Sequence, residues 1–501
     1  MNIFEFTSLV NFNTVTVTIV VVLLILLVSR SLQWPANIPP GPTGYPIIGC
    51  ITLLRNRNIL EVFRELRGQY GDVFSLKIGP NLNVIINGRE ALREAFIKQG
   101  DEFADRPGGF LEEKMFQEKG IVFSSGNYVK QIRTFTSATF RNLGFEKRSL
   151  ELRIQEEVTA YLEIIEKQNG EPYDMKGVAV LAVSNVICSM TFGNRFDYND
   201  TKFKRLTTLI SETLRLLVVG GVINTFPWLR FLPGDRFSIK KIVDNIKEIK
   251  DFIGEQIQEH RHKMDRDNPR DFIEAFLIQQ QKKNSSDEDL KFDDMDLMIS
   301  VMNLFFAGTD TTATIIHWAM LFLIHNKPIQ DKLRQEIMTV VGSSRLPSLA
   351  DKTDMPYYEA FMTEVFRKGN IVPLSLPHGA KKDISFRGMV IPKGSTIMPN
   401  FDSVMSNPDL FEDPDEFRPE RFLGQDGKMN GKERDVMAFS LGRRVCLGES
   451  LARMELFLFM TSLLQRFEFL PESPDKLPTF DATLGITRAA KDYSCRAIKI
   501  Q

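Results

Sequence analysis

Cysteine is scarce in this sequence and is not arranged in pairs. The four cysteines, at positions 50, 188, 446 and 495, are widely separated, and no CxxC motif occurs. This spacing argues against a disulfide scaffold and favours a reducing compartment. No cluster of His, Cys and Asp residues has the spacing of a zinc site.

The chain also lacks a surplus of charge of either sign. Lys and Arg number 63 and Asp and Glu 64, so the formal net charge of −1 offers no electrostatic footprint for nucleic acid. No Gly/Ser linker, internal repeat or GxGxxG nucleotide-binding loop divides the 501 residues, of which 43% are hydrophobic. We therefore predict one large catalytic domain, over residues 34–501.

Charge is absent from residues 6–29, and Val15–Val28 consists only of β-branched residues and leucine. As a helix, this segment is long enough to cross a hydrocarbon core of about 30 Å. A cleaved signal peptide and a buried core helix are the alternatives, but no basic region precedes the stretch and no A-x-A site follows it. The pattern predicts an uncleaved membrane anchor over residues 1–33.

The charges that flank this segment predict its orientation. Arg30, Arg55 and Arg57 follow the apolar stretch, whereas Glu5 precedes it. Positive charge favours the cytoplasmic side of a membrane. In a eukaryotic cell we therefore expect the catalytic domain on the cytosolic face of the endoplasmic reticulum membrane.

Proline and glycine mark the first elements after this segment. Five prolines between positions 35 and 46 disfavour helix and predict a stiff, extended connector. The runs 73–78 and 82–86 are rich in apolar and β-branched residues and flank Gly79-Pro80-Asn81, which predicts a β-hairpin.

Helical periodicity dominates from Phe145 to about Val340. One helix is predicted to begin near Asp293 and Asp294, whose carboxylates suit a helix N-terminus, and to continue to about His325. Such a helix is about 45 Å long, enough to cross the body. The fold class we predict is mainly α with small β-sheets.

One predicted loop carries a sequence pattern that rarely occurs by chance. Residues 439–448 read FxxGxRxCxG, with Cys446 as the only thiol of the loop. A metal-binding thiolate needs a loop that approaches the metal closely, and Gly442 and Gly448 supply backbone freedom where a Cβ would collide. A helix predicted to start at Glu449 would lower the cysteine pKa. A lone buried cysteine is the alternative.

A second pattern lies inside the long predicted helix. In residues 307–312, Ala307 and Gly308 would let the helix open beside a ligand, and Asp310 and Thr311 place a carboxylate next to a hydroxyl. Such a pair can relay protons. A threonine that only donates to the preceding turn of its own helix is the alternative.

Together these motifs resemble the microsomal cytochromes P-450, in the branch that includes vertebrate drug- and lipid-oxidising enzymes. The resemblance runs from the N-terminal segment to Ile498. It implies a haem b (iron protoporphyrin IX) cofactor with Cys446 as the axial metal ligand, and catalytic roles for Thr311 and Asp310 in proton delivery. The other haem-binding positions it implies are Arg106, Arg133, His378, Phe439, Gly442, Arg444 and Gly448.

The resemblance also implies roles for His378 and for a group of charged residues. For His378, the alternative is a core histidine whose hydrogen bonds are satisfied within the protein. Glu364 and Arg367, followed by Arg421, are similar to the family's Glu/Arg/Arg network, which would fix the cysteine loop without taking part in chemistry.

One position departs from the family pattern. The family has Trp four residues before Arg133, and this chain has Val129. The departure removes an indole donor and a large packing surface. We expect weaker haem retention and not loss of activity.

By resemblance, the reaction is insertion of one oxygen atom from O2 into a lipophilic organic substrate, with electrons from NADPH through a membrane-bound flavoprotein reductase. Thiolate ligation favours cleavage of the bond between the two oxygen atoms. Cytochrome b5 is a second candidate partner. A basic docking surface is expected from Lys130, Arg133, Arg141, Lys147, Arg148 and Arg443, for which a solvated face is the alternative.

Apolar residues at the positions that surround the family's cavity suit a fatty acid, a steroid or a xenobiotic. They are Phe110, Leu111, Phe116, Phe305, Phe306, Val372, Leu374, Leu484 and Ile486. The apolar stretch 218–232 is expected to dip into the membrane.

Two other functions fit the sequence. A reductase-independent haem-thiolate isomerase or dehydratase would rearrange peroxides, although Thr311 beside Asp310 argues against it. A haem-binding protein without turnover is suggested by Val129.

Overall fold

The computed structural model describes residues 14–23, 25–26, 37–143, 148–282 and 292–500. In the N-terminal apolar segment, Thr14–Leu23 is helical with exposed side chains. The rest of the predicted 1–33 anchor lies almost wholly outside the described residues. Helices at Thr201–Thr225 and Asp294–His325 are also long and apolar enough to cross a bilayer, and both are partly buried in the protein. Length and apolarity therefore do not single out one membrane span.

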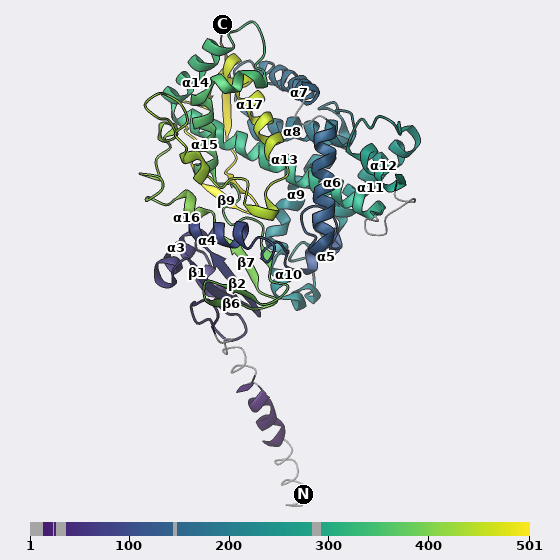
Figure 1. Ribbon diagram of the computed structural model, residues 1–501, viewed down its shortest axis with the longest axis vertical. Coiled ribbons are helices and arrows are strands. Elements are labelled where there is room, and N and C mark those ends of the chain that lie inside the picture. Colours follow the sequence, from purple (N-terminus) through teal and green to yellow (C-terminus); the bar gives the residue numbers. More distant parts are fainter. Residues whose placement is uncertain (1–13, 24, 27–36, 144–147, 283–291, 501) are drawn as a thin grey trace, which may run out of the picture.

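The longest described helix, α13 (Asp294–His325), runs through the middle of the helical region (Figure 1). Asp293 caps it: its carboxylate accepts from the Asp296 amide, and the Asp296 carboxylate accepts from the Asp293 amide. Both predicted ends of this helix are confirmed. It packs along α8 (Met175–Thr191), another apolar helix.

Further helices surround α13, and all the longer ones except α3 (Ile59–Tyr70) share one large apolar core with it, whereas α3 belongs to a separate apolar cluster. The longer ones are α3 (Ile59–Tyr70), α6 (Gly126–Asn142), α7 (Arg148–Glu166), α9 (Thr201–Gly220), α11 (Ile239–Lys263), α12 (Phe272–Lys282), α14 (Lys327–Val340), α15 (Pro356–Gly369) and α17 (Glu449–Arg466). Short helices are α2 (Ile51–Leu54), α4 (Arg89–Arg93), α5 (Phe110–Phe116), α10 (Val222–Thr225) and α16 (Asp402–Met405). The mainly helical prediction is confirmed.

The largest sheet is four-stranded, in the order β1-β2-β7-β4. Strands β1 (Val73–Ile78) and β2 (Asn81–Ile86) form the predicted hairpin, with Val73 opposite Ile86. Strand β7 (Thr396–Pro399) runs parallel to β2, and β4 (His378–Gly379) is antiparallel to β7.

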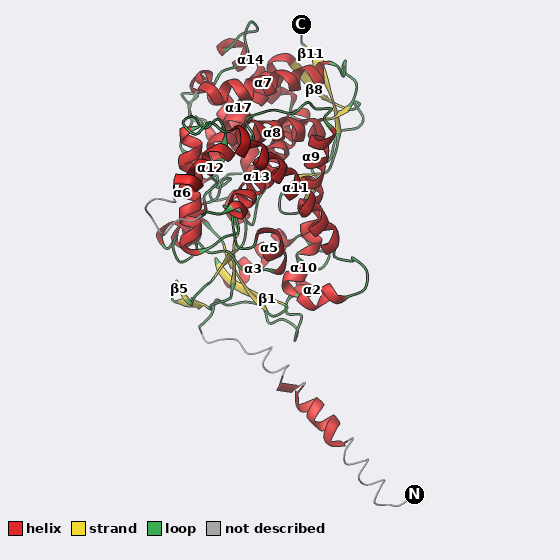
Figure 2. Ribbon diagram, turned by 90° about the vertical axis from the view of Figure 1, so that its right-hand side faces the viewer, coloured by secondary structure: helices red, strands yellow, loops and turns green. Residues whose placement is uncertain are grey.

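Three smaller sheets complete the described fold. They are β3 (Tyr173–Asp174), β11 (Ser494–Lys499) and β8 (Phe467–Pro471) in one sheet, β9 (Ala482–Leu484) with β10 (Arg488–Ala490), and β5 (Ile384–Phe386) with β6 (Met389–Ile391). The sheet with β8 and β11 lies at one end of the body and the one with β5 at the other (Figure 2).

The described part of the proline-rich connector is held against the sheet. The Ser75 amide donates to the Pro40 carbonyl at 2.8 Å, and the Ser75 hydroxyl donates to the Pro39 carbonyl at 2.6 Å. A Cβ on Gly41 would come within 1.7 Å of the Ser75 carbonyl oxygen. The extended segment therefore belongs to the folded body.

Candidate functional site

The loop that carries Cys446 is pressed against the neighbouring chain. Gly442 has φ +67°, and a Cβ there would lie 1.6 Å from the Phe96 carbonyl oxygen. Only glycine fits this position, as the sequence predicted. At Gly448, by contrast, the nearest atom to an added Cβ is the Cys446 sulfur at 3.9 Å, so no collision requires glycine there.

Cys446 opens onto a cavity of about 280 Å³ between its loop and α13. The Cys446 amide donates to the Phe439 carbonyl at 2.9 Å, which closes the loop below the sulfur. From α13, Ala307, Gly308 and Thr311 line the cavity. The sulfur and the helix thus lie on opposite sides of one space.

Burial raises the pKa of the Cys446 thiol, whereas the Gly448 amide and the Arg133 charge lower it. The predicted net lowering by the start of α17 is therefore wrong for the protein without metal, because burial is the larger effect. A coordinated metal cation deprotonates a thiol outright. A bound iron would therefore favour the thiolate form of Cys446.

Three guanidinium groups line the same cavity. Arg106 donates to the carbonyls of Val122, Leu376 and Pro377, and Arg444 donates to those of Ala104 and Ser124. Arg133 donates to the Val445 carbonyl at 2.5 Å.

None of the three forms an ion pair with a carboxylate of the described chain. Burial, followed by the charges of Arg444 and Arg133, lowers the pKa of Arg106. Burial and Arg133 lower the pKa of Arg444 to about 10. Arg106 and Arg444 are each 6% exposed, and positive charge buried without a counter-ion is costly, so these two guanidinium groups favour an anionic group beside them.

His378 is buried behind this wall. Its Nδ1 lies 2.5 Å from the Phe103 carbonyl oxygen, and its ring packs on Phe96 with centroids 4.8 Å apart. Burial and the charge of Arg106 lower its pKa well below the ordinary value. These contacts involve Nδ1 and the face of the ring, and no described residue is hydrogen-bonded to Nε2, so the haem-binding role of His378 stays a prediction.

The two predicted proton-relay residues on α13 have different surroundings. The Thr311 hydroxyl faces the cavity and donates to the Ala307 carbonyl at 2.7 Å. The Asp310 carboxylate accepts from the Thr487 hydroxyl at 2.8 Å. Asp310 is therefore not among the residues that line the cavity.

The α13 helix is unbroken from Asp294 to His325, so it is not open at Ala307 and Gly308, and an opening beside a bound ligand stays a prediction. A Cβ on Gly308 would lie 2.5 Å from the Ile187 side chain. Glycine at this position lets α8 approach closely.

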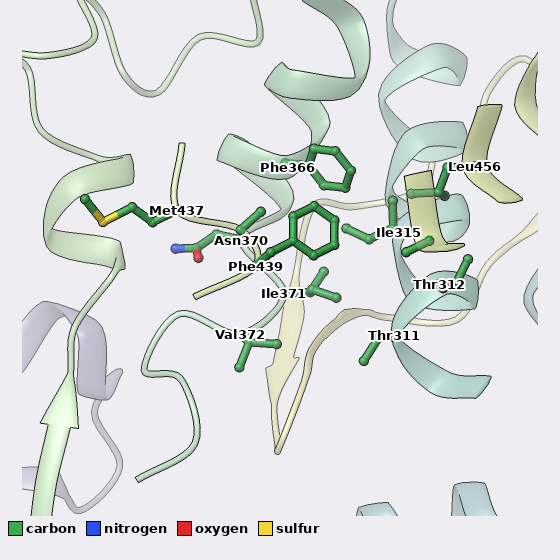
Figure 3. Close-up of a pocket in the computed structure, with 12 residues that line it drawn as sticks. Thr311, Thr312, Ile315, Phe366, Asn370, Ile371, Val372, Met437, Phe439 and Leu456 are labelled. Carbon is green, nitrogen blue, oxygen red and sulfur yellow. The ribbon is translucent and has the colours of Figure 1, made fainter. Parts of the chain in front are cut away.

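Of the predicted pocket residues, Val372 lines the cavity and the others do not. Val372 lines the cavity together with Ile371, opposite Thr311 and close to Phe439 (Figure 3). Phe305 instead stacks on Phe192 with centroids 5.2 Å apart, and Leu374 packs against the core beside the large sheet.

The remaining predicted pocket residues do not line this cavity. Phe116 stacks on Phe123 and meets Phe306 edge to face. Phe110 lies 4.9 Å below the Arg230 guanidinium, and Leu111 is buried. Leu484 belongs to β9, and Ile486 lies in the turn between β9 and β10.

The Glu/Arg/Arg triad is present and buried. Glu364 pairs with Arg367 at 2.7 Å and with Arg421 at 3.1 Å. Both arginines also donate to the Glu416 carbonyl, which belongs to the segment after α16. On the same helix, Phe366 meets Phe439 of the cysteine loop edge to face, at 5.2 Å. The triad therefore holds the helix that braces this loop.

Sequence reasoning missed Asn303 of α13, which also lines the cavity. It lies four residues before Ala307 within an apolar helix. A polar residue one turn away on the same helix face was the signal that could have found it.

The residues present fit a haem. A cysteine sulfur faces a helix across an apolar space, and three guanidinium groups without a carboxylate partner in the described chain line the cavity, where two propionates would balance their charge. Cys446 would hold the iron, and Arg106, Arg133 and Arg444 would hold the propionates.

We expect Gly442→Ala to lower haem content and thermal stability, because the new methyl group meets the Phe96 carbonyl. Gly427→Ala is the matched control, since Gly427 has φ +75° and nothing within 4 Å of an added Cβ. The control carries the backbone strain alone. Equal haem content and melting temperature in both variants would contradict the close-approach explanation.

We expect Val129→Trp to slow haem loss roughly tenfold, because an indole N–H would donate to a charged propionate, worth about 1.5 kcal/mol. Haem transfer to apomyoglobin measures the rate. Val129→Phe adds bulk at this buried position without the donor. A gain in Val129→Phe as large as in Val129→Trp would contradict the hydrogen-bond explanation.

The family model for cytochrome P450 matches residues 39–496 of this chain. Mouse (Mus musculus) cytochrome P450 2B19 is 38% identical over 472 residues, which cover 93% of this chain and 95% of that protein. Rat (Rattus norvegicus) cytochrome P450 2B2 is 40% identical over 434 residues, 86% of this chain and 87% of that protein. Mouse cytochrome P450 2C29 is 42% identical over 435 residues, 86% and 88% of the two chains. This chain therefore belongs to the cytochrome P450 family of haem b-containing monooxygenases, oxidoreductases that take electrons from a reduced flavoprotein.

Proposed function

We propose that this monooxygenase inserts one oxygen atom from O2 into lipophilic small molecules of the fatty acid, steroid or xenobiotic type. The observation that carries the proposal is the cavity between Cys446 and α13. Its distal wall is formed mainly by apolar side chains, including Ile121, Val122, Leu304 and Val372. Such a wall binds apolar surface and excludes water from the reacting centre.

The haem supplies the redox chemistry, and the protein positions the substrate and delivers protons. Thr311 and Thr312 of α13 both line the cavity, but the Thr312 side chain is hydrogen-bonded to Glu455, so Thr311 is the better candidate. Its proton, now donated to the Ala307 carbonyl, becomes available to a ligand when its side chain rotates. Asp310 would act behind it, through its hydrogen bond with Thr487.

We propose that electrons come from NADPH through a membrane-bound flavoprotein reductase, with cytochrome b5 as a second candidate partner. The basic residues near the cysteine loop support a docking surface. Lys130 and Arg443 both reach Asp101, at 3.3 and 3.2 Å. Their hydrogen bonds lower the pKa of Asp101, so this acid stays charged and offsets part of the positive surface. Lys147 lies outside the described residues.

We further propose that the protein acts at the endoplasmic reticulum membrane with its catalytic domain in the cytosol. Exposed apolar side chains support a membrane-facing end: Trp228 is 61% exposed and Phe231 is 76% exposed. A Cβ on Gly79, at the turn of the β1–β2 hairpin, would lie 2.8 Å from Phe226. The exposed Ile47 precedes Ile48, which accepts from the Gly79 amide, so these side chains share one end of the body.

Turnover with purified reductase tests the reaction. With NADPH, isotopically labelled O2 and a panel of lipids and drugs, we expect one labelled oxygen atom in each product and none without reductase. An isomerase would instead convert a hydroperoxide without NADPH or label. A protein without turnover would bind ligands and release no product. Either result would overturn the proposal.

A further inference from the structure

Asn303 is a buried amide in the apolar wall of the cavity. Its residue is 2% exposed, and it lines the cavity one helical turn before Ala307. The oxygen of its side chain accepts two backbone N–H groups, from Ile121 at 2.9 Å and Val122 at 3.1 Å. Asn303 thus ties α13 to the segment that forms the facing wall.

These two hydrogen bonds fix the orientation of the amide. A flipped side chain would set its NH2 group against two backbone donors, which is unfavourable. The nitrogen must therefore stay on the other side. Among the described residues, Nδ2 of Asn303 donates no hydrogen bond. This nitrogen is not among the fully enclosed polar atoms that lack a partner, so it is open to the cavity, where a ligand oxygen can accept from it.

The surrounding charge favours an oxygen acceptor over a cation. The Val122 carbonyl also accepts from Arg106 at 3.1 Å and from Arg444 at 3.5 Å, so positive charge stands just behind the Asn303 contact. Asp296, two turns earlier on α13, is committed to Lys119 and Tyr128. Among the residues that line the cavity, the one carboxyl group is that of Glu455 on α17, and burial raises its pKa to about 8, which favours the neutral acid.

We propose that Nδ2 of Asn303 is a substrate-orienting donor that binds a carbonyl or carboxylate oxygen of an otherwise apolar substrate. This inference rests on the proposed function, because it names the polar group that such a substrate carries. Asn303 and Thr311 are eight residues apart on α13, about 12 Å along a helix axis. The substrate is therefore oxidised at a carbon remote from its oxygen acceptor.

The decisive variant is Asn303→Asp. A carboxylate still accepts from Ile121 and Val122, so the wall stays in place, but the donor is gone. Asn303→Leu removes both the acceptor and the donor. Hydrogen exchange at the Ile121 and Val122 amides separates the two effects: we expect protection to persist in Asn303→Asp and to fall in Asn303→Leu.

Binding of four ligands to the haem-loaded protein, measured by calorimetry, tests the donor. Cyclododecanone and cyclododecane differ by one carbonyl oxygen, cyclododecylamine carries a cation, and dodecanoate carries a carboxylate. We expect the wild-type protein to bind the ketone at least tenfold more tightly than the hydrocarbon. In Asn303→Asp this ratio should fall to about one, and the amine should gain affinity. A preference for dodecanoate over the ketone would identify the acceptor as a carboxylate.

Two results would contradict different parts of the proposal. A wild-type protein that binds none of the four overturns the proposed apolar substrate class, and this inference with it. Equal affinity for ketone and hydrocarbon, or a ratio unchanged in Asn303→Asp with intact amide protection, overturns the Asn303 assignment alone.

Discussion

Three guanidinium groups share one wall of the cavity, and within the described chain only backbone carbonyls accept their hydrogen bonds. Carbonyl dipoles solvate part of the charge, but they leave the net positive charge in place. Since uncompensated buried charge is costly, an anionic group against the buried Arg106 and Arg444 stabilises this wall. A ligand that binds only the native state stabilises that state, so cofactor retention and folding are coupled here.

The cysteine loop is held from two sides by contacts that do not involve the thiol. Gly442 meets the Phe96 carbonyl on one side. On the other, Phe366 packs on Phe439, and the Arg453 guanidinium lies 4.8 Å above the Phe439 ring. Behind Phe366, the Glu364 triad fixes the same helix to a distant loop. These contacts of the scaffold, none of which involves the thiol, position the sulfur at the cavity.

Local patterns allowed the best predictions from sequence. Three predictions each depended on one short stretch of sequence: the hairpin, the ends of α13 and the requirement for glycine at position 442. The partners of Asp310 and His378 could not be predicted, because Thr487 and Phe103 lie 177 and 275 residues away in the chain. The role of Gly308 was misjudged for the same reason: it depends on Ile187 of another helix.

The central claim is that Cys446 donates its sulfur to a haem held by the arginine wall. The carbon monoxide difference spectrum of the reduced, haem-reconstituted protein tests it most directly. The wild-type protein and Cys50→Ala, which removes a buried thiol beside the sheet, should show the long-wavelength band of a haem-thiolate complex. Cys446→Ala should lose it. The same band in Cys446→Ala would contradict the account.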